Sequence, residues 1–140
     1  MSLVYWDTML FVYWFEGTPA RANRIQTIFS GMETRGDHLV TSAFAVGELL
    51  VGPQKQGDVE AVARIRDGIQ EVARILPFTL QTAALYSIIR AQHGVSPADA
   101  IHLACAAEAR VDLFLTNDAK LVAKVIPGIQ FIAGLDVNLY

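Results

Sequence analysis

The sequence predicts an α/β protein with three layers, α/β/α, and a central, mostly parallel sheet. Short apolar runs alternate with longer segments of helical periodicity along the 140 residues. Strands separated by helices favour parallel pairing, with helices covering both faces of the sheet. Hydrophobic residues make up 53% of the chain and charged residues 18%, which is enough apolar surface for a buried core. No repeat or linker interrupts the pattern, so we expect a single domain over residues 1–140.

The first part of the chain predicts a strand, two helices, a second strand and a third helix. In order, these elements are expected at residues 3–6, 9–16, 20–35, 38–41 and 44–51. The helix over 20–35 has its apolar residues at helical spacing, namely Ile25, Ile28, Phe29 and Met32. Glycine and proline mark the ends of the three helices and the turn before the second strand, at Gly17, Pro19, Gly36 and Gly52-Pro53.

The second part predicts four helices and three strands. In order, these are a helix at 58–74, a strand at 75–78, helices at 80–92 and 96–110, a strand at 113–115, a helix at 119–125 and a strand at 129–132. The helix over 58–74 is amphipathic, with a charged face opposite an apolar one. The helix that begins at Ser96 has the clearest start, because serine is a favoured N-cap and Pro97 fits the first helical position.

Four carboxylates stand out from this arrangement. Asp7 ends the first predicted strand and Asp118 follows the strand at 113–115, and the carboxyl ends of parallel strands are where functional groups gather. Asp99 lies in the first turn of a helix. Each of these three acids also fits an ordinary capping role. Glu48 has no such role in the middle of an apolar helix, so it either faces solvent or needs a cation.

Carboxylates brought together repel one another unless a cation neutralises them. Mg²⁺ or Mn²⁺ takes oxygen ligands and keeps several waters, one of which can attack a phosphodiester. The pattern therefore favours a metal-dependent nuclease. The net charge of −3 weakens a nucleic-acid interpretation, but setting the four acids aside changes it to +1.

Three segments together resemble the PIN domain family, and within it the toxin ribonucleases of type II VapBC toxin–antitoxin pairs. They are Val4-Tyr5-Trp6-Asp7-Thr8, the stretch from Thr41 to Gly52 with its Glu-Leu-x-x-Gly signature, and Ser96 to Ala106 followed by Leu115-Thr116-Asn117-Asp118. The resemblance implies Mg²⁺- or Mn²⁺-dependent endoribonuclease activity at Asp7, Glu48, Asp99 and Asp118. It further implies an RNA substrate, a homodimer, and inhibition by a cognate antitoxin that binds a groove beside the active centre.

One position departs from the family pattern. Many members have a small polar residue two positions after the first acid, where this chain has Met9. Thr8 and Thr116 are the candidates to supply the missing hydrogen bonds to the carboxylates.

Two observations bear on the compartment. The single cysteine, Cys105, cannot form an intrachain disulfide. No apolar run is long enough to cross a bilayer. We therefore expect a cytoplasmic protein without a membrane partner.

Other interpretations stay open at this stage. A PIN fold without turnover would be an RNA- or protein-binding module, and Met9 is its only support. Phosphoryl transfer through an aspartyl phosphate at Asp7 is a weaker alternative. His102 is expected to be packed or to support the site rather than to bind the metal. The aromatic residues Trp6, Phe11, Trp14 and Phe15 fit a core better than a partner surface.

Overall fold

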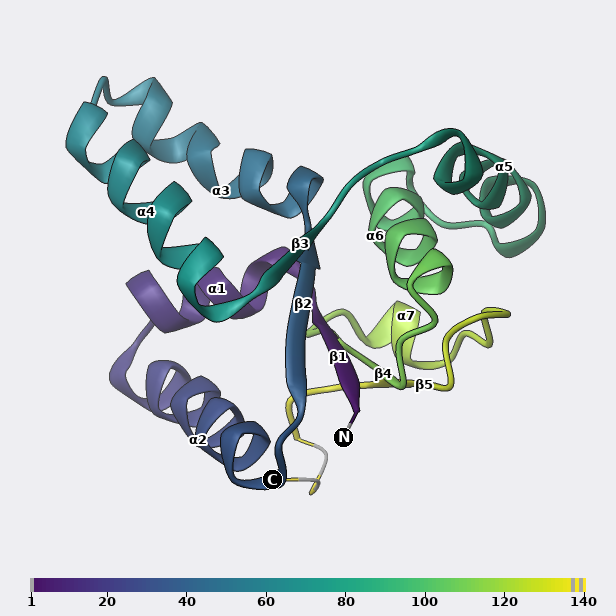
Figure 1. Ribbon diagram of the computed structural model, residues 1–140, viewed down its shortest axis with the longest axis horizontal. Coiled ribbons are helices and arrows are strands. Elements are labelled where there is room, and N and C mark those ends of the chain that lie inside the picture. The colour runs from purple at the N-terminus through teal and green to yellow at the C-terminus, as the bar shows by residue number, and fades with distance from the viewer. Residues whose placement is uncertain (1, 137, 139) are drawn as a thin grey trace.

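A computed structural model describes residues 2–136, 138 and 140, and its centre is a five-stranded sheet (Figure 1). The strands are β1 (Leu3–Trp6), β2 (His38–Ser42), β3 (Arg74–Leu76), β4 (Leu113–Leu115) and β5 (Phe131–Ala133). Their order is β3-β2-β1-β4-β5 and every pairing is parallel. The predicted parallel α/β architecture is therefore confirmed.

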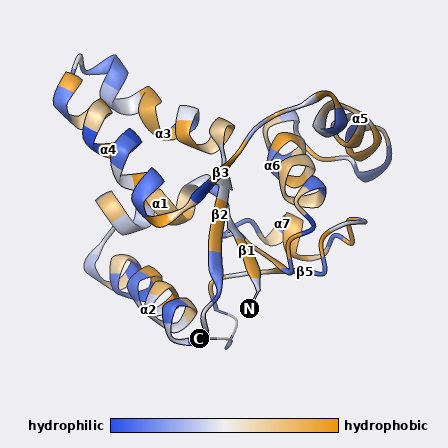
Figure 2. Ribbon diagram, viewed as in Figure 1, coloured by the Kyte–Doolittle hydropathy of each residue, from blue (hydrophilic) through white to orange (hydrophobic). Residues whose placement is uncertain are grey.

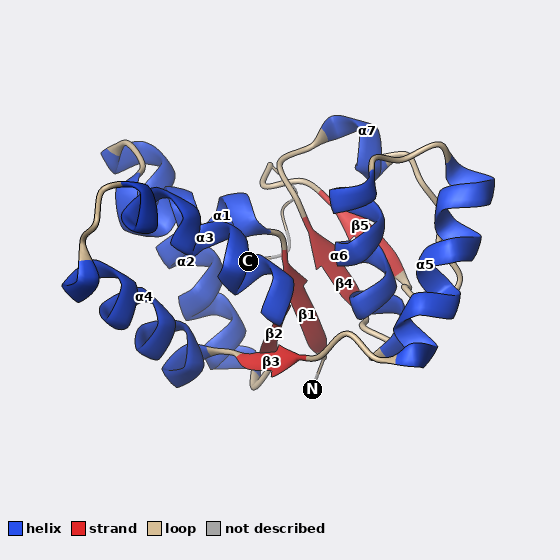
Figure 3. Ribbon diagram, turned by 90° about the horizontal axis from the view of Figure 1, so that it is seen from above, coloured by secondary structure: helices blue, strands red, loops and turns tan. Residues whose placement is uncertain are grey.

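Helices cover both faces of the sheet, as Figures 1 and 3 show. One side carries α1 (Thr8–Glu16), α2 (Pro19–Arg35), α3 (Ala43–Lys55) and α4 (Val59–Val72). The other side carries α5 (Leu80–His93), α6 (Pro97–Glu108) and the short α7 (Ala119–Val122). In the described part of the chain, no helix combines the length and apolarity needed to span a bilayer.

The alternation of side chains along β1 divides the core into two halves. Val4 and Trp6 pack on one face, against α1 and α2, whereas Tyr5 packs on the other, against α6. Both faces of the central strand are buried, which explains its uninterrupted apolar sequence. Figure 2 shows the complementary pattern in α2 and α4, where hydrophobic and hydrophilic residues alternate around the helix.

Several predicted boundaries are wrong; the helix predicted at 119–125 ends at Val122, and the strand predicted at 75–78 ends at Leu76. Helix α3 continues through Pro53 to Lys55, although the sequence predicted an end at Gly52-Pro53. A proline in the last turn removes only one helical hydrogen bond, and Gln56 N still donates to the Gly52 carbonyl at 3.2 Å. Burial of Leu49 anchors the helix on the core.

The start of β3 and the bounds of β5 also differ from the prediction, because of sheet pairing in the first case and loop burial in the second. Arg74, predicted to end a helix, starts β3 because it pairs with Val40 of β2. The last strand is Phe131–Ala133 rather than 129–132. Ile129 is buried in a turn instead, since its N–H donates to the Ile126 carbonyl at 3.1 Å. The apolar side chain of Ile129 is therefore explained by its burial in the core and not by strand pairing.

Candidate functional site

The candidate site lies at the carboxyl edge of the sheet, between β1 and β4. Strands β2 and β3 follow β1 and lie on one side of it. The chain then crosses over, and β4 and β5 lie on the other side of β1. The carboxyl ends of the strands on either side of such a switch point form a crevice where α/β proteins bind ligands. Asp7 follows β1 and Asp118 follows β4, so both acids lie at this crevice.

All four predicted acids line one pocket of about 500 Å³, together with Thr8 and His102. Each acid comes from a different segment: Asp7 from the β1 end, Glu48 from α3, Asp99 from the first turn of α6, and Asp118 from the β4–α7 connection. The structure thus brings together residues that span 112 positions of the sequence, from 7 to 118. The remaining lining residues are Met9, Tyr13, Ala98, Asn117 and Ala119.

Asp7 is held at both carboxylate oxygens. Its Oδ1 accepts a hydrogen bond from the Thr8 backbone N–H at 2.8 Å, and its Oδ2 accepts one from the Thr116 hydroxyl at 2.8 Å. Thr116 is fully buried, and its Oγ1 also accepts from the Asp118 N–H at 3.0 Å. Thr116 therefore links two of the acids, in agreement with the proposed supporting contact.

The capping interpretation holds for Asp7 and Asp118, whereas the structure shows no capping box in which the Asp99 carboxylate reaches back to Ser96. Asp7 and Asp118 are the N-caps of α1 and α7, and Asp118 Oδ1 accepts from the Lys120 N–H at 2.9 Å. Ser96 caps α6 by accepting from the Asp99 N–H at 3.2 Å. Capping and pocket lining are combined in the same residues, because a helix that starts after a parallel strand starts at the carboxyl edge.

Glu48 has partners that its sequence context did not reveal. Its Oε1 accepts from the Thr8 hydroxyl at 2.6 Å and lies 2.7 Å from His102 Nε2. Hydrogen bonding to His102 is the main cause that lowers the pKa of Glu48 below its ordinary value, with burial opposing it and Thr8 assisting. The surroundings of Glu48 therefore favour the ionised form of its side chain.

His102, expected to support the site, is joined behind Glu48 by Tyr5 and Ser42, which sequence analysis missed. Tyr5 OH lies 2.6 Å from His102 Nδ1 and 2.8 Å from Ser42 Oγ. Tyr5, Ser42 and His102 are all buried. Their signal in the sequence is weak but present: each is a polar side chain within an otherwise apolar element, and buried polar groups need partners.

The four acids share a pocket without converging on one point. Among the residues that the structure describes, no three His, Cys, Asp or Glu side chains form a ready metal-binding cluster. An arrangement in which all four carboxylates converge on one metal ion is therefore not observed among the described residues. Glu48 is directed to His102 and Thr8, Asp7 is directed to Thr116, and like charges repel one another.

Asp99 differs from Glu48 in its electrostatics. Burial is the main cause that raises its pKa above the ordinary value, and the charges of Asp7 and Asp118 raise it further. A carboxyl whose pKa is higher in the folded state than in the unfolded state destabilises the fold when it is ionised. That penalty disappears as the pH falls through the folded-state pKa toward the unfolded-state pKa.

We therefore expect Asp99→Asn to increase the free energy of unfolding in metal-free buffer at pH 7, with a smaller difference near pH 4.5. Urea denaturation in EDTA measures this. The matched control is Glu60→Gln, which also removes an acid from the first turn of a helix but lies outside the pocket. A loss of stability in Asp99→Asn as large as that in Glu60→Gln would contradict the expected repulsion.

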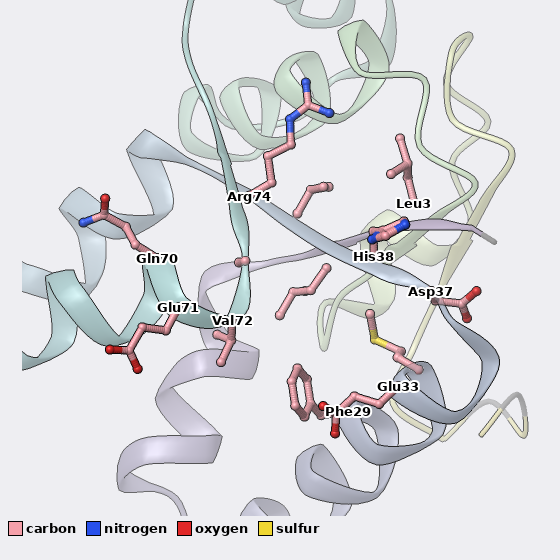
Figure 4. Close-up of a pocket in the computed structure, with 13 residues that line it drawn as sticks. Leu3, Phe29, Glu33, Asp37, His38, Gln70, Glu71, Val72 and Arg74 are labelled. Atoms are coloured by element: carbon pink, nitrogen blue, oxygen red, sulfur yellow. The ribbon is translucent and has the colours of Figure 1, made fainter.

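A second hollow, of about 770 Å³, lies at the opposite edge of the sheet (Figure 4). Leu3, His38 and Arg74, which begin β1, β2 and β3, are among its lining residues. Glu33, at the end of α2, and Asp37, in the turn that follows, also line it. None of the four predicted acids lines it, so the chemistry predicted from the sequence belongs to the carboxyl edge.

Comparisons with known proteins agree with this architecture. A chain of the DNA-bound VapBC complex from Salmonella typhimurium superimposes with a TM-score of 0.73 at 23% identity, over 96% of this chain and 99% of that one. A chain of the DNA-bound VapBC2 complex from Rickettsia felis gives 0.71 at 17% identity, over 94% and 98%. A chain of a toxin–antitoxin complex from Klebsiella pneumoniae gives 0.67 at 20% identity, over 90% and 94%. No curated protein shows significant sequence similarity to this chain.

The sequence itself matches one family model. The PIN domain model covers residues 4–125, which include all four acids of the pocket and every strand except β5. The resemblance noted from three short segments therefore extends over most of the chain, and the protein belongs to the PIN domain family.

Proposed function

We propose that the protein is a Mg²⁺- or Mn²⁺-dependent endoribonuclease and the toxin of a VapBC-type toxin–antitoxin pair. The observation that carries this proposal is the single pocket lined by Asp7, Glu48, Asp99 and Asp118, each from a different segment. Membership of the PIN domain family supports it. Phosphodiester hydrolysis accounts for four acids in one pocket better than a purely structural role does.

The donor set fits a hard divalent cation. Carboxylate oxygens are the ligands that Mg²⁺ and Mn²⁺ prefer, and Mg²⁺ needs only one or two of them because it keeps several waters. The absence of a ready three-residue cluster among the described residues is compatible with that requirement. The four acids would hold the ion directly or through its waters, and the bound ion would supply charge neutralisation and a water of lowered pKa.

The chain's own residues prepare the pocket for this role. Thr116 and Thr8 donate to Asp7 and Glu48, so the carboxylates are oriented before a ligand arrives. The Arg21 guanidinium lies 4.6 Å from the centroid of the Tyr13 ring, which lines the pocket. It places a positive charge beside an acidic site and is suited to an RNA phosphate.

The partner is proposed from the structural neighbours, which are described as VapBC and toxin–antitoxin complexes. We propose that a cognate antitoxin binds this chain and inhibits it, and that the chain forms a homodimer. A short neighbouring reading frame whose product forms a complex with this protein and stops RNA cleavage would support the antitoxin. Light scattering of the purified chain tests the dimer.

The purified protein is expected to cleave labelled RNA with millimolar Mg²⁺ or Mn²⁺ and not in EDTA, because in the proposed reaction the bound cation would activate the attacking water. Gel analysis of cleavage measures this. Calorimetric titration with Mn²⁺ separates a nuclease from a binding module. A protein that binds RNA but neither binds Mn²⁺ nor cleaves would favour the binding module.

A further inference from the structure

His102 is a buried imidazole placed between the core and the acidic pocket. It lies on α6, one turn after Asp99, and is 2% exposed. Its Nε2 is 2.7 Å from Glu48 Oε1, and its Nδ1 is 2.6 Å from Tyr5 OH. Both ring nitrogens are occupied by protein groups, so His102 is not available as a metal ligand or as an acid or base in contact with solvent.

The imidazole is fixed from the core side. Tyr5 is fully buried and stacks on Phe114, with ring centroids 4.9 Å apart and an interplanar angle of 6°. The Tyr5 hydroxyl lies 2.8 Å from Ser42 Oγ, and the Phe44 ring meets the imidazole edge-on at 5.2 Å. Packing and hydrogen bonds therefore restrict both the position and the rotation of the His102 ring.

The same network is tied to the helix that carries Glu48. Ser42 is the N-cap of α3, since its Oγ accepts from the Ala45 N–H at 3.0 Å. Glu48 lies further along α3 and is approached by His102 from α6. The network thus sets where α3 begins and also where its carboxylate points.

The contacts of His102 leave part of Glu48 open. The hydrogen bonds from Thr8 and His102 both go to Oε1, so the second oxygen remains for a ligand in the pocket. His102 Nε2 also lies 3.6 Å from Asp7 Oδ1, between two acids from different segments. An N–H donor at that position reduces the repulsion between the two carboxylates.

We infer that His102 is a positioning residue: held by Tyr5, it fixes Glu48 and separates it from Asp7 so that the pocket can take a divalent cation. This inference rests on the proposed metal-dependent function. In this role, Nδ1 of His102 is held by Tyr5, and Nε2 orients the Glu48 carboxylate, which would bind the metal.

Two isosteric variants separate this role from general packing. A glutamine amide reaches the place of Nε2, so His102→Gln keeps a donor to Glu48. An asparagine amide reaches the place of Nδ1, so His102→Asn keeps the contact with Tyr5 and loses Glu48. We expect His102→Asn to weaken Mn²⁺ binding by about 10- to 100-fold and to lower kcat with little change in KM, whereas His102→Gln stays within about 3-fold.

Tyr5→Phe is the third variant, because it removes the hydroxyl and keeps the stacking on Phe114. We expect it to weaken Mn²⁺ binding by up to about 10-fold. Calorimetry gives the Mn²⁺ affinity, and thermal unfolding in EDTA checks that each variant folds. If His102→Asn does not fold, Tyr5→Phe decides the question.

A readout without metal keeps the inference separate from the proposed function. The ¹³C carboxyl resonance of Glu48 in EDTA is expected to shift in His102→Asn and Tyr5→Phe and to stay near its original position in His102→Gln. Equal Mn²⁺ affinities and equal resonances in all variants would overturn the positioning role. A parent protein that binds no Mn²⁺ would instead overturn the proposed function, and the resonance would still decide whether His102 holds Glu48.

Discussion

Asp7→Asn is expected to lower kcat for metal-dependent RNA cleavage by at least about 100-fold while the fold stays intact. The substitution removes one negative charge from the pocket and replaces a carboxylate oxygen by an amide nitrogen. Asparagine is as good an N-cap as aspartate, so the hydrogen bond from the Thr8 N–H to Oδ1 can persist and α1 keeps its start. Single-turnover cleavage of labelled RNA measures the loss.

The matched control for this prediction is Asp58→Asn. Asp58 is the N-cap of α4, where its carboxylate accepts from the Ala61 N–H at 3.0 Å, and it lies outside the acidic pocket. It undergoes the same chemical change in the same local role, so it is expected to leave kcat within about 2-fold. Undiminished metal-dependent cleavage by Asp7→Asn would contradict the assignment of Asp7 to the active site.

Most of the fold could be predicted from the sequence because local and global signals agree. The strand Leu3–Trp6 was predicted with its observed bounds, since a strand buried on both faces needs an uninterrupted apolar run. The sequence was less informative where tertiary pairing decides. Arg74 gives no local sign that it pairs with Val40, and Ile129 reads as a strand residue although it fills the core from a turn.

The site shows the same division between local and long-range information. The four acids could be found because they stand at element junctions, or in the case of Glu48 on an apolar helix. The supporting role of His102 was anticipated, but its contacts with Tyr5 and Ser42 could not be, because these residues are distant in sequence and meet only when the sheet and α6 pack together. Of the aromatic residues expected in the core, Trp6 and Phe11 are fully buried, whereas Phe15 is 45% exposed.

Trp6→Ala is expected to lower the free energy of unfolding by about 3–5 kcal/mol. Trp6 is fully buried and contacts three aromatic rings, those of Phe11, Trp14 and Phe29, at centroid distances of 5.3, 5.4 and 6.2 Å. Loss of the indole leaves a void between β1, α1 and α2. A domain of ordinary stability has about 5–15 kcal/mol in total, so the variant would be close to unfolding. Urea denaturation measures the change.

Trp6→Phe isolates the contribution of the void. Trp6 Nε1 is, within the described residues, the buried side-chain nitrogen or oxygen that lacks a hydrogen-bond partner. Replacing the indole by phenyl removes that unpaired donor, which offsets part of the lost volume. We therefore expect a clearly smaller loss in Trp6→Phe. Equal losses in the two variants would show that cavity formation is not the cause.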